Sequence, residues 1–96
     1  MLPDVKTALR ITNAAFDSEI EDLIAAARHD LTLSGVSQGI ANAVENVDPL
    51  IKRAIITYCK ANFGYDNPDA DRFTASYNML KSHLSLAGDY KHVPVE

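Results

Sequence analysis

The chain has 96 residues, of which 47% are hydrophobic and 23% are charged, and its formal net charge is −4 at pH 7. This composition is typical of one folded domain, and the acidic balance argues against a protein that coats DNA through clustered Lys and Arg. A single cysteine, Cys59, excludes an intramolecular disulfide, and no apolar run reaches the roughly 18 residues that span a bilayer. We therefore expect a small cytoplasmic protein without a signal peptide or a membrane partner.

The first third of the chain predicts two helices. Residues 2–11 form the first, with Pro3 in its opening turn. After the break at TNAAF, we expect a second helix that starts at Asp17 or Ser18, either of which can cap the free backbone N–H groups. Ser18 with Glu21 fits the Ser-x-x-Glu capping box. The residues expected on the buried face recur at helical spacing and are Ile20, Leu23, Ile24, Ala27 and Leu31.

The middle of the chain predicts a long loop and then the clearest helix. Gly35 is the expected stop of the second helix, and residues 36–47 have weak periodicity, so we expect a loop with one helical turn. Asp48 is the expected cap of the next helix, Pro49 its first residue and Gly64 its end. The predicted buried stripe of this helix comprises Ile51, Ile55, Tyr58, Cys59 and Phe63.

The last third predicts a fourth helix and a tail. Asn67 is the expected cap and Pro68 the first helical residue. The apolar residues expected to share one face are Phe73, Tyr77, Leu80 and Leu84. We therefore expect an all-α fold: a small bundle of about four helices at residues 1–87, with a long loop between the second and third. Residues 88–96 are expected to be an extended or disordered tail.

No residue pattern predicts catalysis or a bound cofactor. An Asp-Ser pair that opens a helix is how acyl carrier proteins present the serine that holds their prosthetic group. In that motif Leu or Ile follows the serine, whereas Glu19 follows Ser18 here, so we interpret Asp17 and Ser18 as helix caps. Cys59 lies on the predicted apolar stripe, which favours a core residue over a nucleophile.

No pattern predicts a metal site either. A calcium loop of the EF-hand type needs glycine at its sixth position and an acidic group at its twelfth. Counted from Asn67, these positions hold Arg72 and Asn78. We therefore interpret Asp66, Asp69 and Asp71 as solvated turn and capping residues. The histidines lie on separate predicted elements without ligand spacing and are His29, His83 and His92.

The order and spacing of these segments resemble the head-tail connector (adaptor) family of tailed bacteriophages, whose members are also described as DNA-packaging proteins. The resemblance covers residues 3–86. The segments that carry it are VKTALRI, FDSEIEDLIAAAR, LSGV, DPLIKRAIITYCKANFGYDNPDADRF and YNMLKSHL.

The resemblance implies a structural protein and not an enzyme. Such adaptors form a ring of about twelve copies beneath the portal, with heterologous contacts between copies. The ring extends the DNA channel, through which DNA passes without specific binding, and offers a docking surface for a neck or tail completion protein. The implied location is the head-tail interface of the virion, after assembly in the cytoplasm of the bacterial host.

Three groups of residues are the contacts that we expect in such a ring. The loop group would face the channel or a neighbouring subunit and comprises Val36, Ser37, Gln38, Gly39, Ile40 and Asn42. The tail group would order on the portal and comprises Tyr90, Lys91, His92, Val93, Pro94 and Val95. The subunit-interface group would join an acidic helix start to a basic strip on another copy and comprises Glu19, Glu21, Asp22, Lys52, Arg53 and Lys60.

Two alternatives from other classes stay open. A small helical DNA-binding regulator needs a recognition helix with several exposed basic residues, and the helix after Asp48 offers Lys52, Arg53 and Lys60 beside a large apolar stripe. A carrier or small enzyme subunit needs a covalent group or a cluster that only the fold brings together. The tail also has a simpler interpretation as a frayed terminus, and the basic strip has one as a solvated face.

Overall fold

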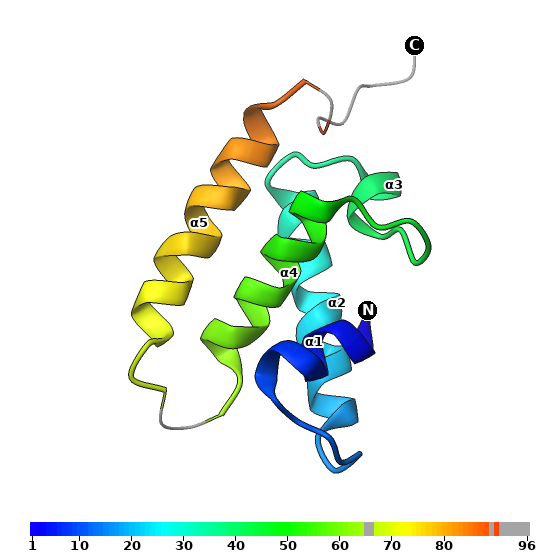
Figure 1. Cartoon of the computed structure of the whole chain (residues 1–96). Coiled ribbons are helices and arrows are strands. Elements are labelled where there is room, and N and C mark those ends of the chain that lie inside the picture. Colours follow the sequence, from blue (N-terminus) through cyan, green and yellow to red (C-terminus); the bar gives the residue numbers. More distant parts are fainter. Residues whose placement is uncertain (65–66, 89, 91–96) are drawn as a thin grey trace.

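The computed structural model describes residues 1–64, 67–88 and 90, and these residues form five helices (Figure 1). The helices are α1 (Leu2–Leu9), α2 (Asp17–Leu33), α3 (Gln38–Ala41), α4 (Pro49–Asn62) and α5 (Ala70–Leu86). The described ranges contain no strand. The all-α class is therefore confirmed, and α3 is the single helical turn expected within the loop of residues 36–47.

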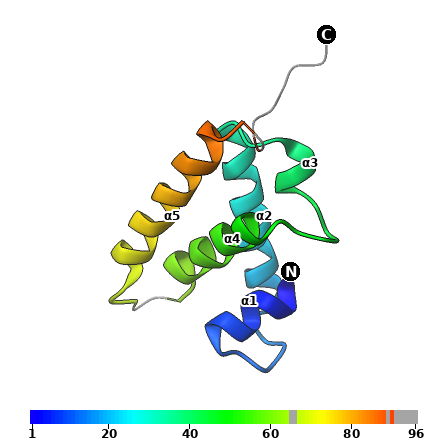
Figure 2. The same cartoon turned by 45° about the horizontal axis from the view of Figure 1, so that its top comes forward.

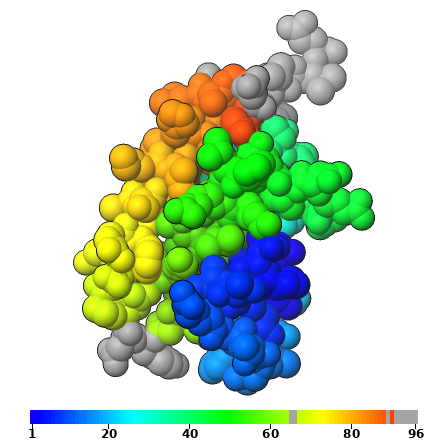
Figure 3. All heavy atoms as spheres, viewed as in Figure 1, coloured from blue at the N-terminus to red at the C-terminus, as the bar shows by residue number. Residues whose placement is uncertain are grey.

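Helix α4 is the central element of the fold. It packs against α5 on one side and against α2 on the other, while α1 lies against both α2 and α4. This arrangement is visible in two views of the chain (Figures 1 and 2). On one face, the side chains of α5, α4 and α1 form a continuous surface, and the segment around α3 projects from its edge (Figure 3).

The core lies where α4 meets its three partners. The predicted faces of α2 and α4 are confirmed, because each predicted residue is buried or packs against the core. On α5, Tyr77, which is only 3% exposed, and Leu84 are buried and Leu80 packs against the core, but the prediction for Phe73 is wrong, because this side chain is only partly buried and lies outside the core cluster. Two residues of the long loop, Val36 and Ala41, are also buried at 1% exposure, so the loop contributes to the core as well as to the surface. The largest fully buried side chains are Val5, Ile20, Leu31, Val36, Ile51, Ile55, Cys59 and Leu84.

Helix α4 begins as the sequence predicts. Asp48 Oδ1 accepts hydrogen bonds from the backbone N–H groups of Leu50, at 2.9 Å, and Ile51, at 3.4 Å. These are two of the donors that the first turn of a helix leaves without backbone partners. At the other end, Gly64 has φ 87°, which favours glycine because it has no Cβ. Asp48 and Gly64 therefore mark the two ends of α4.

Helix α2 begins differently, and the capping interpretation of Asp17 and Ser18 is wrong. Phe16 is the N-cap residue, and no side chain caps the helix. The Asp17 carboxylate instead lies 2.7 Å from Lys6 Nζ on α1, where the ion pair ties α1 to the start of α2. Negative charge in this first turn remains favourable because it faces the positive end of the helix dipole.

The start of α5 also differs from the prediction. The helix begins at Ala70, two residues after Pro68. Asn67 Oδ1 accepts from the Asp69 N–H at 3.1 Å, which forms a turn before the helix. The Asn67 amide group donates to the Lys60 carbonyl oxygen at 2.6 Å. Asn67 therefore fastens the turn to α4 instead of capping α5.

A polar contact joins α2 to α5 at the edge of the core. The Tyr77 hydroxyl donates to Asp30 Oδ2 at 2.6 Å, and Lys81 Nζ donates to the same oxygen at 3.1 Å. Partial burial acts to raise the pKa of Asp30, but the hydrogen bonds from Tyr77 and Lys81 outweigh it and hold the pKa below its usual value. Burial and the adjacent carboxylate raise the pKa of Tyr77. A carboxyl group with a lowered pKa stabilises the fold above its unfolded pKa of about 3.9, and that contribution disappears as the pH falls through the folded value.

Replacing Tyr77 with Phe should lower the free energy of unfolding by about 1–2 kcal/mol, because a buried hydrogen bond to a charged acceptor is lost. Urea denaturation at pH 7 measures the change. Tyr58→Phe is the matched control, because Tyr58 packs edge-on against Tyr77 at 5.1 Å but its hydroxyl makes no hydrogen bond to the described residues. Equal destabilisation by the two variants would contradict the assigned role of the Tyr77–Asp30 bond.

Candidate functional site

Cys59 is confirmed as a core residue. It has 0% exposure, and burial raises the pKa of its thiol to about 12. A thiol of this kind stays protonated at neutral pH and is a poor nucleophile. Within residues 1–64, 67–88 and 90, no group of three or more His, Cys, Asp or Glu side chains could hold a metal ion. In the same part of the chain, no helix has the length and apolar character needed to cross a membrane.

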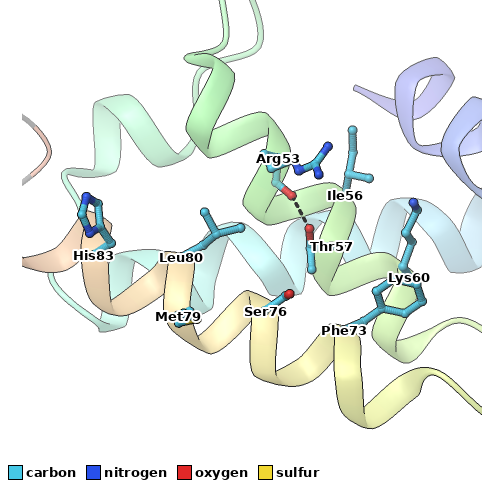
Figure 4. Close-up of a pocket in the computed structure, with 9 residues that line it drawn as sticks. All are labelled: Arg53, Ile56, Thr57, Lys60, Phe73, Ser76, Met79, Leu80 and His83. Carbon is cyan, nitrogen blue, oxygen red and sulfur yellow. Dashed lines mark hydrogen bonds between the residues drawn. The ribbon is translucent and has the colours of Figure 1, made fainter.

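A groove lies between α4 and α5 and is here called the α4–α5 groove (Figure 4). Its volume is about 480 Å³. Helix α4 supplies Arg53, Ile56, Thr57 and Lys60. Helix α5 supplies Phe73, Ser76, Met79, Leu80 and His83. These residues recur at intervals of three and four along each helix, so one face of each helix forms one wall.

The α4–α5 groove combines an apolar surface with positive charge. Lys60 Nζ lies 5.5 Å from the centroid of the Phe73 ring, and Arg72 Cζ lies 5.3 Å from the same centroid. Met79, which also lines the groove, is 73% exposed and adds apolar surface to it. None of the described residues that line the groove is acidic. The groove is therefore suited to an apolar side chain with negative charges beside it.

A second hollow lies beside residues 36–47, here called the α3 loop, where the chain returns after α5. Its volume is about 380 Å³, and Tyr90 forms part of its wall. The Tyr90 hydroxyl donates to Asp48 Oδ2 at 2.9 Å, and the Ser37 N–H donates to the Tyr90 carbonyl oxygen at 2.7 Å. We call these contacts the Tyr90 junction. They fasten a residue that we expected in the tail to the loop and to the start of α4.

The loop group divides into buried and exposed members. Val36 is part of the core, Ile40 packs against the core, and Ser37 belongs to the Tyr90 junction. The end of α3 is held to α2 because Arg28 Nη1 donates to the Asn42 carbonyl oxygen at 3.1 Å. The exposed members of the loop group, which remain available for a contact, are Gln38, Gly39 and Asn42.

The structure separates the three cations of the expected subunit interface. Lys52 pairs with Asp4 of the same chain at 3.1 Å, whereas Arg53 and Lys60 line the α4–α5 groove. The acidic members of the interface group are exposed on α2 and are Glu19, Glu21 and Asp22. Helix α4 packs against three other helices, and Arg53 is the basic residue of its exposed surface.

Part of the tail group lies outside the described residues, namely Lys91, His92, Val93, Pro94 and Val95. The same holds for Asp66 of the acidic turn. Of the described histidines, His29 is exposed on α2 and His83 lies at the α4–α5 groove. These two therefore stay on separate elements, as the sequence predicts.

Sequence reasoning missed the α4–α5 groove and the Tyr90 junction. The spacing of Phe73, Ser76, Leu80 and His83 indicates one face of α5, but only the packing of α5 on α4 shows that this face forms a groove. Tyr90 meets Ser37 and Asp48 across long sequence separations, and no local pattern predicts such a contact. Phe16 was also missed as a surface residue, although it is 45% exposed at the start of α2.

A family model described as phage connector protein matches residues 1–91 of this chain. The match covers all five helices and Tyr90. No curated protein and no solved structure gives a significant match.

Tyr90→Phe should lower the free energy of unfolding by about 1 kcal/mol, because it removes the hydroxyl that bonds to Asp48. Asp48→Ala should cost more, about 2 kcal/mol, because it removes this bond and the cap of α4. In an Asp48→Ala background the further change at Tyr90 should have little effect, and a double-mutant cycle by urea denaturation measures this coupling. An equal effect of Tyr90→Phe in both backgrounds would contradict the junction.

Proposed function

Because the chain belongs to the phage connector protein family, and is thus a component of the head-tail connection of the virion, we propose that it assembles as a ring on the portal. The ring extends the DNA channel and provides a docking surface for a neck or tail completion protein. The observation that carries the proposal is the family match over residues 1–91, which spans almost the entire chain.

The surface of the chain supports a role through contacts rather than through chemistry. A ring repeats one contact between two different patches of each copy, so a small domain suffices to build a large assembly. The groove with its positive rim and the acidic start of α2 are two such different patches. The net charge of −4 also suits a channel through which DNA slides without binding.

We assign the α3 loop a role in the channel or at a neighbouring subunit. The segment around α3 projects from the helical body (Figure 1), and Val44, which follows α3 in the chain, is 79% exposed. Val36 at its start and Ala41 at the end of α3 are buried, and Val47 near its other end packs against the core. The position of the loop is therefore defined, although its exposed residues can make contacts. This combination suits a loop that reaches outward from a ring.

The residues after Tyr90 are the proposed portal contact. The Tyr90 junction fixes the residue directly before them next to the α3 loop. Alternating apolar residues in the sequence KHVPV allow an extended segment to add to a partner through backbone hydrogen bonds.

The direct test is sedimentation of the purified chain with and without the portal ring that is encoded with it. We expect the chain to co-migrate with the portal at about one copy per portal subunit, because a ring adaptor matches the symmetry of its platform. Absence of binding to an intact portal would contradict the proposed function, and salt-dependent binding to duplex DNA would then favour the regulator.

Removal of residues 91–96 should weaken portal binding by tenfold or more while leaving the stability of the domain unchanged. This truncation keeps Tyr90, so the junction with Asp48 is preserved. Removal of residues 88–96 is the comparison, because it also breaks the junction and should lower stability. Portal binding equal to that of the full chain would contradict the role of the tail, even if the sedimentation test succeeds.

Two lysines placed on the outer loop, Gln38→Lys with Val44→Lys, should disturb either ring formation or the passage of DNA. A subunit contact would suffer from the added charge, and a channel loop would attract the phosphates and slow ejection. The matched control is Asn78→Lys with Ser82→Lys, two exposed positions one turn apart on α5. Normal rings and normal DNA ejection in the loop variant would contradict the assignment.

A further inference from the structure

We propose that the α4–α5 groove of one copy receives the start of α2 of the next copy, with Phe16 as the apolar anchor and Glu19, Glu21 and Asp22 facing the basic rim. The inference rests on the proposed ring and deepens it by naming the two surfaces that meet.

The α4–α5 groove offers both an apolar wall and positive charge. Ile56, Phe73 and Leu80 provide an apolar wall, and Arg53 and Lys60 provide positive charge along α4. Arg53 makes no ion pair within the described ranges, so its charge is available to a partner. The hydroxyl of the lining threonine is already bonded to the Arg53 carbonyl oxygen at 2.8 Å. The apolar side chains and the two cations of the groove therefore favour a partner that presents an apolar group flanked by negative charges.

The start of α2 has the complementary composition. Phe16 is 45% exposed, with its ring edge-on to Phe63 at 5.5 Å between centroids. The three acidic side chains follow within two turns, are exposed, and make no ion pair with any described residue. An aromatic residue beside unpaired charges is typical of an interface anchor with a polar rim.

The positions of the two surfaces suit a ring. Helix α5 lies on one side of α4, and the start of α2 lies on the other side, beside α1, in both views (Figures 1 and 2). The two surfaces share no residue, so each copy can use both at once. A contact between two different patches is heterologous, and repeated heterologous contacts close into a ring when the rotation permits.

Other occupants fit the groove less well. The residues after Tyr90 include one lysine, one glutamate and no Phe, Tyr or Trp side chain, so they supply neither the aromatic anchor nor the run of negative charges that the groove suits. Duplex DNA gains little from an apolar wall, and the cation beside Phe73, Arg72, already pairs with Asp69 at 3.6 Å. A second copy of this chain is therefore the occupant that complements both the apolar wall and the basic rim of the groove.

The test uses charge reversal on the full chain. Variant A carries Arg53→Glu and Lys60→Glu, and variant B carries Glu19→Lys, Glu21→Lys and Asp22→Lys. Each variant alone places like charges on both surfaces, so we expect at least a tenfold fall in the number of copies bound per portal. An equimolar mixture restores opposite charges at every contact if A and B alternate, so assembly should recover. Arg10→Glu, an exposed change outside the groove, is the control and should assemble normally.

The outcomes separate this inference from the proposed function. If variant A or variant B alone binds the portal in as many copies as the wild-type chain does, the inference is wrong and the connector role stands. If A and B fail alone and the mixture also fails, although circular dichroism shows folded proteins, the groove binds a different partner and the inference is again wrong. If the wild-type chain does not bind the portal, the proposed function fails. Sedimentation of the A and B mixture without portal then decides the inference, because mixed oligomers absent from either variant alone would support it and their absence would overturn it.

Discussion

The fold depends on the burial of α4 on several sides at once. Ile51, Ala54, Ile55 and Cys59 are all at 0% exposure, and α4 packs against α1, α2 and α5. Burial of apolar surface is the dominant favourable term in folding, so α1, α2 and α5 are held mainly by their contacts with α4 and with each other. As each outer helix uses one face for the core, its other face remains exposed, and in this small domain those faces are where contacts with other proteins must form.

The helices were predictable because their apolar residues recur at helical spacing and the breaks between them carry local signals. Asp48 and Pro49 specify the start of α4 within a few residues of sequence, and the structure agrees. The start of α2 was not predictable in the same way. Its Ser-x-x-Glu pattern fits a local cap, but the ion pair between Asp17 and Lys6 comes from the packing of α1 on α2. Local patterns therefore succeed where the bonding partners are neighbours in sequence.

The candidate site shows the same limit more strongly. The sequence indicates charged residues on α2 and α4, but it does not show that Lys52 is paired with Asp4 while Arg53 and Lys60 border a groove. A groove forms only where two helices pack against each other. From sequence alone, the apolar residues of α5 are therefore predicted to lie in the core. Whether a charged side chain is already paired or can bind a partner likewise depends on neighbouring residues that are distant in sequence and are brought close by the fold.

The two oxygens of Asp48 have separate roles, and this has a consequence for the end of the chain. Oδ1 holds the first turn of α4, and Oδ2 accepts the Tyr90 hydroxyl. Breaking the Tyr90 bond therefore leaves the cap in place, at a cost of about 1 kcal/mol for one hydrogen bond. The attachment of Tyr90 can therefore be lost and made again without unwinding the first turn of α4.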